Sequence, residues 1–201
     1  MNTDHKLSDL MAVAAARATP VVRGIGDEQL GAPTPCAEYD VKDLVNHLLH
    51  VVVEFQALAA KGSADFTVTP DYVARDADWR ERFAREADGL AAAWSAPGAD
   101  EGTTGTMGLP AATVGAMALL DLTVHAWDLA RATGQEYEVQ AGAPGAPGLA
   151  DVLEVLRGAV EGMAPTARSM GVFGEPVPVR EDATSLERLL ARTGRDPAWL
   201  K

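Results

Sequence analysis

The sequence is poor in cysteine and in basic residues. Cys36 is the single cysteine among 201 residues, so no disulfide can form within the chain. Only 17 Lys and Arg, scattered along the chain, stand against 29 Asp and Glu, which gives a formal net charge of −12. A protein with this acidic balance is a poor partner for nucleic acid or for an anionic membrane surface. We therefore expect a protein that binds neither.

Long apolar runs are also missing. No stretch approaches the roughly 18 consecutive apolar residues of a membrane-spanning helix. The first residues, MNTDHKLSDLM, lack the basic and apolar regions of a secretory signal peptide. Together with the single cysteine, these features predict a cytoplasmic protein.

What the chain does contain is helical periodicity, without alternation of strands and helices. Apolar residues recur at helical spacing in four segments, which predicts an all-α fold built on a four-helix bundle. Asp40 fits an N-cap and Gly134 a C-terminal stop, whereas Pro20 is expected to kink or end the first helix near Thr19. The four predicted helices cover about 4–25, 41–61, 71–95 and 110–133.

The remainder of the chain predicts a short C-terminal extension. A linker at 142–148 precedes a further helix at about 149–163, and the stretch VFGEPVPV is expected to form a strap or a short strand pair. Thr184 and Glu187 fit a capping box, and Gly194 fits a helix C-cap. We expect residues 1–140 to form the bundle and 141–201 to pack on it within a single domain.

Helix 41–61 places one histidine near the bundle interior. At about 100° per residue, His47 lies at the edge of the apolar stripe that contains Leu44, Leu48 and Val51. His50 lies about 60° further out, towards the boundary or solvent. Glu54 follows His47 by two turns, close to the same line.

Helix 110–133 carries three polar residues on one face. Asp121 and His125 are four residues apart and therefore neighbours, and Asp128 lies within about 20° of Asp121. An Asp-x-x-x-His pair can supply two ligands to a divalent metal, and His47 is the best-placed third ligand. Two histidines and one carboxylate suit zinc, iron, nickel or manganese, and three protein ligands leave open positions typical of catalytic sites.

Each of these residues also has a simpler interpretation. Asp121 and His125 can form a surface ion pair, and His47 can be a hydrogen-bonded core residue. Asp128 can pair with Arg131 or hydrogen-bond a metal ligand, and Glu54 can lie behind a ligand or in solvent. The other residues considered are expected to be structural: Cys36 as a small packed residue with a reactive role as the alternative, and Trp79, Trp94 and Trp127 as core or interface aromatics.

Three stretches resemble a known family. The segments TPCAEYDVKDLVNHLLH and LLDLTVHAWDLARATGQ are similar to the DinB-like family that includes mycothiol-dependent maleylpyruvate isomerase. The closing PVPVREDATSLERLLARTGRDPAW is similar to the tail of its short actinobacterial subgroup of metal-binding proteins. The resemblance implies a DinB-type bundle with a metal held by His47, Asp121 and His125.

The sequence departs from the isomerase in three places. The isomerase has Glu where Asp121 stands, and the family commonly has Trp where Tyr39 stands, a position expected to lie away from the metal. The isomerase also has a larger C-terminal domain that helps to bind maleylpyruvate, whereas about 50 residues follow the linker here. Maleylpyruvate is therefore a poor candidate for the substrate.

The family chemistry suggests a metal-dependent S-transferase or isomerase. The metal, Zn²⁺ in the first place and Ni²⁺, Fe²⁺ or Mn²⁺ as alternatives, would activate an exogenous low-molecular-weight thiol such as mycothiol towards an electrophile. Asp128 would orient a histidine ligand. The alternatives are a non-catalytic metal- or ligand-binding bundle, a metal-hydroxide hydrolase, and a bundle that has lost its metal. The expected partners are a small thiol and an electrophile, and a homodimer is compatible with the sequence.

Overall fold

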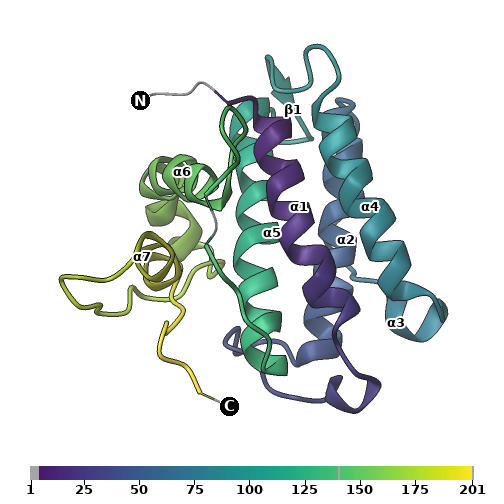
Figure 1. Cartoon of the computed structure of the whole chain (residues 1–201). Helices are drawn as coiled ribbons and strands as arrows, with labels where there is room; N and C mark the ends of the chain where they lie inside the picture. The colour runs from purple at the N-terminus through teal and green to yellow at the C-terminus, as the bar shows by residue number, and fades with distance from the viewer. Residues whose placement is uncertain (1–4, 140, 201) are drawn as a thin grey trace.

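Four long helices form the body of the protein (Figure 1). The structure is a computed structural model that describes residues 5–139 and 141–200. Helix α1 packs against both α4 and α5, and α2 packs against the same two helices, so the four helices surround one core. This arrangement confirms the predicted all-α, DinB-like bundle. Its helices are α1 (Leu7–Arg23), α2 (Val41–Ala59), α4 (Trp79–Trp94) and α5 (Ala111–Thr133).

The core is built from the apolar stripes that the sequence indicated. Each bundle helix turns large side chains inwards, and burial of this apolar surface is the main force that holds the helices together. Trp79, Trp94 and Trp127 are buried in this core, as expected. Its other members include Leu10, Met11, Leu44, Leu48, Phe83, Leu90, Leu119 and Leu122.

Two of the predicted helix ends are confirmed and one is wrong. Asp40 accepts a hydrogen bond from the Asp43 amide at 2.8 Å, and Gly134 ends α5 with a left-handed φ of 74°. Helix α1 does not end near Thr19 but continues through Pro20 to Arg23. Pro20 faces solvent, and the buried side chains that follow it keep the last turn packed on the core. Residue 4, where the prediction began this helix, lies outside the described residues.

The predicted helix at 71–95 is in fact two helices. A single turn, α3 (Tyr72–Arg75), precedes α4, and Asp76 between them is extended with φ −131° and ψ 108°. The Asp76 carboxylate accepts a hydrogen bond from the Asp78 amide at 2.9 Å. This local bond competes with the helical pattern, which explains the break.

The loop between α4 and α5 contains a small hairpin that the sequence did not indicate. Strands β1 (Thr103–Thr104) and β2 (Leu109–Pro110) pair antiparallel. The buried Thr104 hydroxyl donates to the Leu58 carbonyl at 2.6 Å, which ties the hairpin to the end of α2. A short 3-10 turn, η1 (Asp27–Gln29), lies in the connection between α1 and α2.

The C-terminal extension lies on the side of the bundle formed by α1 and α5 (Figure 1). Helix α6 (Leu149–Ser169) is six residues longer than predicted, and α7 (Ser185–Arg192) packs on it. The predicted capping box is confirmed, since Thr184 and Glu187 exchange hydrogen bonds. Gly194 follows the end of α7 with φ +87°. The stretch 172–179 is a strap without a strand, and the Val177 amide donates to the Ala191 carbonyl at 3.0 Å, beside α7.

The division between the bundle at 1–140 and the extension at 141–201 stays a prediction, and residue 140 lies outside the described residues. In the described part of the chain, every helix is either too short or too polar to cross a lipid bilayer.

Candidate metal centre

One cavity brings together the three residues predicted to hold a metal. His47 from α2 and Asp121 and His125 from α5 line a cavity of about 300 Å³. Because α2 and α5 are packed neighbours, residues far apart in the sequence face the same space. The walls are completed by the loop before α2, by the loop after α6 and by residues that follow α7.

The three predicted ligands are neighbours at this cavity. His125 Nε2 lies 4.0 Å from Asp121 Oδ1, and the rings of His47 and His125 meet edge to face with centroids 5.1 Å apart. Two atoms that are each about 2.1 Å from one ion can be at most about 4.2 Å apart. An ion shared by Nε2 and Oδ1 would therefore need these two atoms on nearly opposite sides of it, or a small movement of the two side chains. The donor set of two imidazoles and one carboxylate is one that divalent ions bind.

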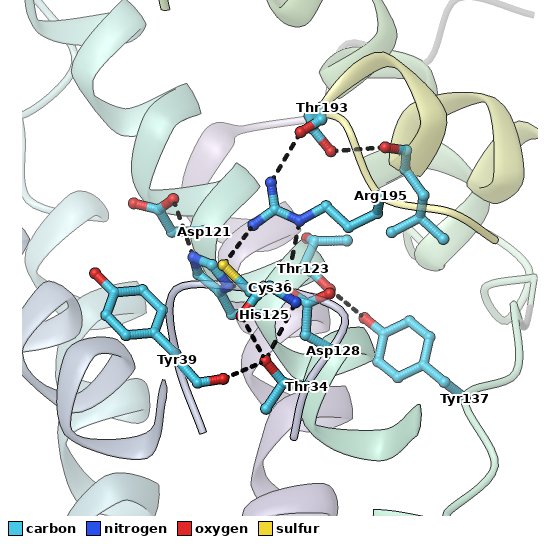
Figure 2. A network of polar contacts seen from close by, with 11 residues as sticks. Thr34, Cys36, Tyr39, Asp121, Thr123, His125, Asp128, Tyr137, Thr193 and Arg195 are labelled. Atoms are coloured by element: carbon cyan, nitrogen blue, oxygen red, sulfur yellow. Dashed lines mark hydrogen bonds and ion pairs between the residues drawn. The ribbon is translucent and has the colours of Figure 1, made fainter. Parts of the chain in front are cut away.

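Asp128 fixes the orientation of the His125 ring. Its carboxylate is 0% exposed, and its Oδ2 lies 3.0 Å from His125 Nδ1 (Figure 2). A carboxylate can only accept, so Nδ1 carries the hydrogen and Nε2 keeps its lone pair. Of the two alternatives predicted for Asp128, the structure has the hydrogen bond to His125. Arg131 instead donates to the Trp199 carbonyl at 2.7 Å.

The loop before α2 brings two further side chains into the cavity. The Thr34 hydroxyl bonds to the carbonyls of Cys36 and Tyr39 at 2.9 and 2.8 Å, which fixes the loop. Cys36 Sγ faces the cavity, so this residue is not merely a packed side chain. The Tyr39 ring stacks on the His47 ring with centroids 5.1 Å apart. The expectation that Tyr39 lies away from the predicted ligands is therefore wrong.

Arg195 reaches the cavity from the end of the extension. Its guanidinium donates to Cys36 Sγ at 3.5 Å and lies 3.5 Å from Asp128 Oδ2 (Figure 2). The side chain is 9% exposed, so the charge is largely removed from water. The backbone turn after α7 positions it, because the Arg195 amide bonds to the Leu190 carbonyl at 2.9 Å. Arg195 thus links the last part of the chain to the bundle.

Among the described residues, the group whose ligand atoms lie close enough together to hold a metal ion differs from the predicted set. The ligand atoms of Cys36, His125 and Asp128 all lie within 4.8 Å of one another. His125 belongs both to this group and to the predicted set. The two groups differ in their surroundings, since Arg195 contacts both Cys36 and Asp128.

Burial shifts the pKa values of several groups at the cavity. It lowers the pKa of His47 to about 3, and a positive charge on His125 acts in the same direction. It raises the pKa of the Asp121 carboxyl, against the opposing effect of His125 and Arg195. It also raises the pKa of the Cys36 thiol, while the Arg195 guanidinium lowers it. His47 is therefore a neutral imidazole at physiological pH, as metal binding requires.

His50 and Glu54 lie on a different side of α2. His50 was expected at the boundary or in solvent, but it is buried because the segment at 60–72 covers it. Its Nε2 contacts the Asp65 carbonyl at 2.8 Å and its Nδ1 the Tyr72 hydroxyl at 3.2 Å. Glu54 accepts from the Asp65 amide at 2.9 Å and lies 3.9 Å from His50. Both residues hold this covering segment and lie outside the lining of the cavity.

Comparison with known proteins agrees with this fold. The family model described as mycothiol maleylpyruvate isomerase N-terminal domain matches residues 11–130. The chain belongs to this DinB-like family. Two relatives from Mycobacterium tuberculosis, the uncharacterised proteins Rv0738 of strain H37Rv and MT0763 of strain CDC 1551, are each 29% identical over 174 residues. Those residues cover 84% of this chain and 86% of each relative, and no solved structure gives a significant match.

The family match covers only part of the cavity. It includes His47, Asp121 and His125, but it ends before the extension that supplies Phe173, Thr193 and Arg195. Sequence reasoning missed Arg195 as a site residue, although it stands in the GRDP stretch that carried part of the resemblance. That stretch was the available signal, since periodicity gives no information about a residue beyond the last helix.

Proposed function

We propose that this protein is a divalent-metal-dependent thiol transferase or isomerase, with the metal held by His47, Asp121 and His125. The observation that carries the proposal is the contact between His125 Nδ1 and the buried Asp128 carboxylate. Carboxylate–histidine pairs of this kind orient metal ligands, and here the free Nε2 is directed towards Asp121. The donor set favours Zn²⁺, with Ni²⁺, Fe²⁺ or Mn²⁺ as alternatives.

The surroundings favour this ligand set over Cys36, His125 and Asp128. A cation at the second group would lie against the Arg195 guanidinium, which contacts both Cys36 and Asp128. Like charges at such short range in a buried site repel strongly. His125 Nδ1 would also have to give up its hydrogen bond to Asp128.

The chemistry follows from a metal with open positions. A divalent ion favours the deprotonated form of a thiol that binds it. Cys36 is held by Arg195, so we propose that the reacting thiol is an exogenous low-molecular-weight one, of the mycothiol type. In a transfer, its sulfur would displace a leaving group from an electrophilic carbon, and that group would depart with the thiol proton. In an isomerisation, its sulfur would add to a double bond together with this proton and leave again, so that the thiol is regenerated. Within the chain, Asp128 holds the proton on His125 Nδ1, and neutral His47 and the Asp121 carboxyl group complete the site.

Metal analysis of purified variants tests the ligand set. We expect about one metal ion per chain in the wild type and in Cys36→Ser, and little metal in His47→Ala and His125→Ala. His5→Ala is a matched control, because His5 lies near Asp151 at 3.8 Å and outside the cavity. Metal retained in His47→Ala but lost in Cys36→Ser would place the ion in the second group and refute the proposed ligands.

Turnover distinguishes an enzyme from a binding protein. The metal-loaded wild type should accelerate the addition of a low-molecular-weight thiol to some member of a panel of electrophiles, and His47→Ala should not. Stoichiometric metal without turnover across a broad panel would favour the non-catalytic, metal-binding alternative.

A further inference from the structure

The cavity has two chemically different walls. One wall holds the predicted metal ligands together with Cys36 and Arg195. The other is apolar and combines two elements, α5 and the loop that follows α6. Its apolar members are Leu120, Val124, Val172 and Phe173.

The loop after α6 is held firmly in place. The amides of Val172 and Phe173 both bond to the Ala167 carbonyl, at 2.8 and 3.3 Å, and Gly171 provides the positive φ of +74° that this turn needs. Arg168 donates to the Gly174 carbonyl at 3.3 Å and to the Arg192 carbonyl at 2.7 Å. These bonds join the loop to the end of α7.

A close backbone contact completes the attachment. A Cβ atom at Gly194 would lie 2.6 Å from the Gly174 Cα, so only glycine allows this approach. Gly194 directly precedes Arg195, and the loop and the Arg195 segment are therefore fixed relative to each other. The apolar wall is preorganised.

Val172 is the least covered part of this wall. Its side chain is 63% exposed although the loop around it is fixed, whereas Val124 and Leu120 are buried at the α5 side. The Phe173 ring is partly buried against the core beside it. Ligand sites of small molecules are lined mainly by apolar groups with a few polar groups that fix orientation. An exposed valine at the edge of a polar centre is the arrangement expected where an apolar part of a ligand lies.

We propose that the electrophile bound in this cavity is amphipathic, with a polar head at His47, Asp121 and His125 and an apolar body along Val172 and Phe173. This inference rests on the proposed function, because it names the substrate class of the same site. The volume of about 300 Å³ is at the lower end of the range of about 300–1,000 Å³ for ligand pockets. The apolar body is therefore small, of the size of one ring or a short alkyl chain.

Hydroxamates of increasing length test the proposal by binding rather than by activity. Acetohydroxamate carries a metal-binding head with one methyl group, and hexanohydroxamate carries the same head with four more methylenes. Titration calorimetry with the zinc-loaded protein gives both dissociation constants. Each methylene that becomes buried should strengthen binding about fourfold. We expect hexanohydroxamate to bind the wild type at least tenfold more tightly than acetohydroxamate.

A variant in the loop after α6 tests whether the tighter binding of hexanohydroxamate depends on the apolar wall. Val172→Asp should reduce the gain in affinity from acetohydroxamate to hexanohydroxamate to less than threefold. Val155→Asp is the matched control, because Val155 is also an exposed valine, 43% accessible, but lies on α6 outside the cavity. It should keep the full gain.

The outcomes separate this inference from the proposed function. Equal affinities of the two hydroxamates for the wild type, or an unchanged gain in Val172→Asp, would overturn the amphipathic ligand while leaving the metal site intact. No binding of acetohydroxamate to the zinc-loaded protein would refute an open metal position, and with it both proposals.

Discussion

Replacing Asp128 tests the arrangement around His125 most directly. The Asp128 carboxylate is buried, contacts His125 Nδ1 at 3.0 Å and lies 3.5 Å from the Arg195 guanidinium. Asp128→Asn keeps the shape and an acceptor oxygen but removes the charge, whereas Asp128→Ala removes both. Neither variant removes any of the three proposed metal ligands.

Replacing Asp128 should weaken metal binding and should also lower the free energy of unfolding. Loss of a carboxylate that orients a histidine ligand weakens metal binding about 10- to 100-fold, which corresponds to about 1.4–2.7 kcal/mol. Loss of one partner of a buried ion pair destabilises a fold by about 3–5 kcal/mol, since the other charge stays buried. Arg195 keeps some access to solvent and donates to the Thr193 carbonyl, so we expect the lower part of this range for Asp128→Ala.

The assay measures the two effects separately. Competition with a chelator gives the zinc affinity, and urea unfolding of the metal-free protein gives the free energy of unfolding. Asp100→Asn, an exposed carboxylate, is the control and should change neither value. Zinc affinity within twofold of the wild type in both Asp128 variants would refute the role of Asp128 in orienting His125. Abolished binding in Asp128→Asn would instead point to Asp128 as a direct ligand.

Other predictions concern the fold. Thr184→Ala removes the cap of α7 and should lower the free energy of unfolding by about 1 kcal/mol in urea titration, with Ser185→Ala as an exposed neighbour that should change it less. Gly115→Ala places a Cβ against Leu7 and 2.9 Å from the Trp94 ring and should destabilise the bundle by about 1–3 kcal/mol, and a melting temperature equal to that of the wild type would contradict the close approach of these two side chains to Gly115. Leu90→Ala leaves a hole in the core and should lower the free energy of unfolding by about 2–5 kcal/mol, whereas a change below 1 kcal/mol would show that Leu90 is not buried.

The sequence predicted much of the bundle because its signals are local. The helical spacing of Leu44, Leu48 and Val51 and the caps at Asp40 and Gly134 are visible in short windows, and the structure has these elements. Apolar spacing in short segments did not predict the break at Asp76, where a hydrogen bond to the Asp76 carboxylate interrupts the helix. It also misplaced His50, because a segment that follows later in the chain covers it.

The site was predictable only in part, for a related reason. Asp121 and His125 lie on one helix, so their proximity follows from helical geometry, and His47 could be added because its helix has one apolar face. The positions of Cys36, Tyr39 and Arg195 depend on loop conformations and on how the extension packs. The periodicity of apolar residues predicts neither the loop conformations nor the packing of the extension. The contacts of Cys36, Tyr39 and Arg195 are therefore visible only in the structure.

The two sides of the cavity can change independently in evolution. The predicted metal ligands belong to α2 and α5, inside the matched family region, whereas Phe173, Thr193 and Arg195 belong to the extension outside it. A different extension would alter part of the cavity lining while the predicted ligands on α2 and α5 stayed the same residues. Two proteins with this bundle can therefore share these residues of α2 and α5 and still differ in the rest of the cavity lining, so the extension is the region to compare between relatives.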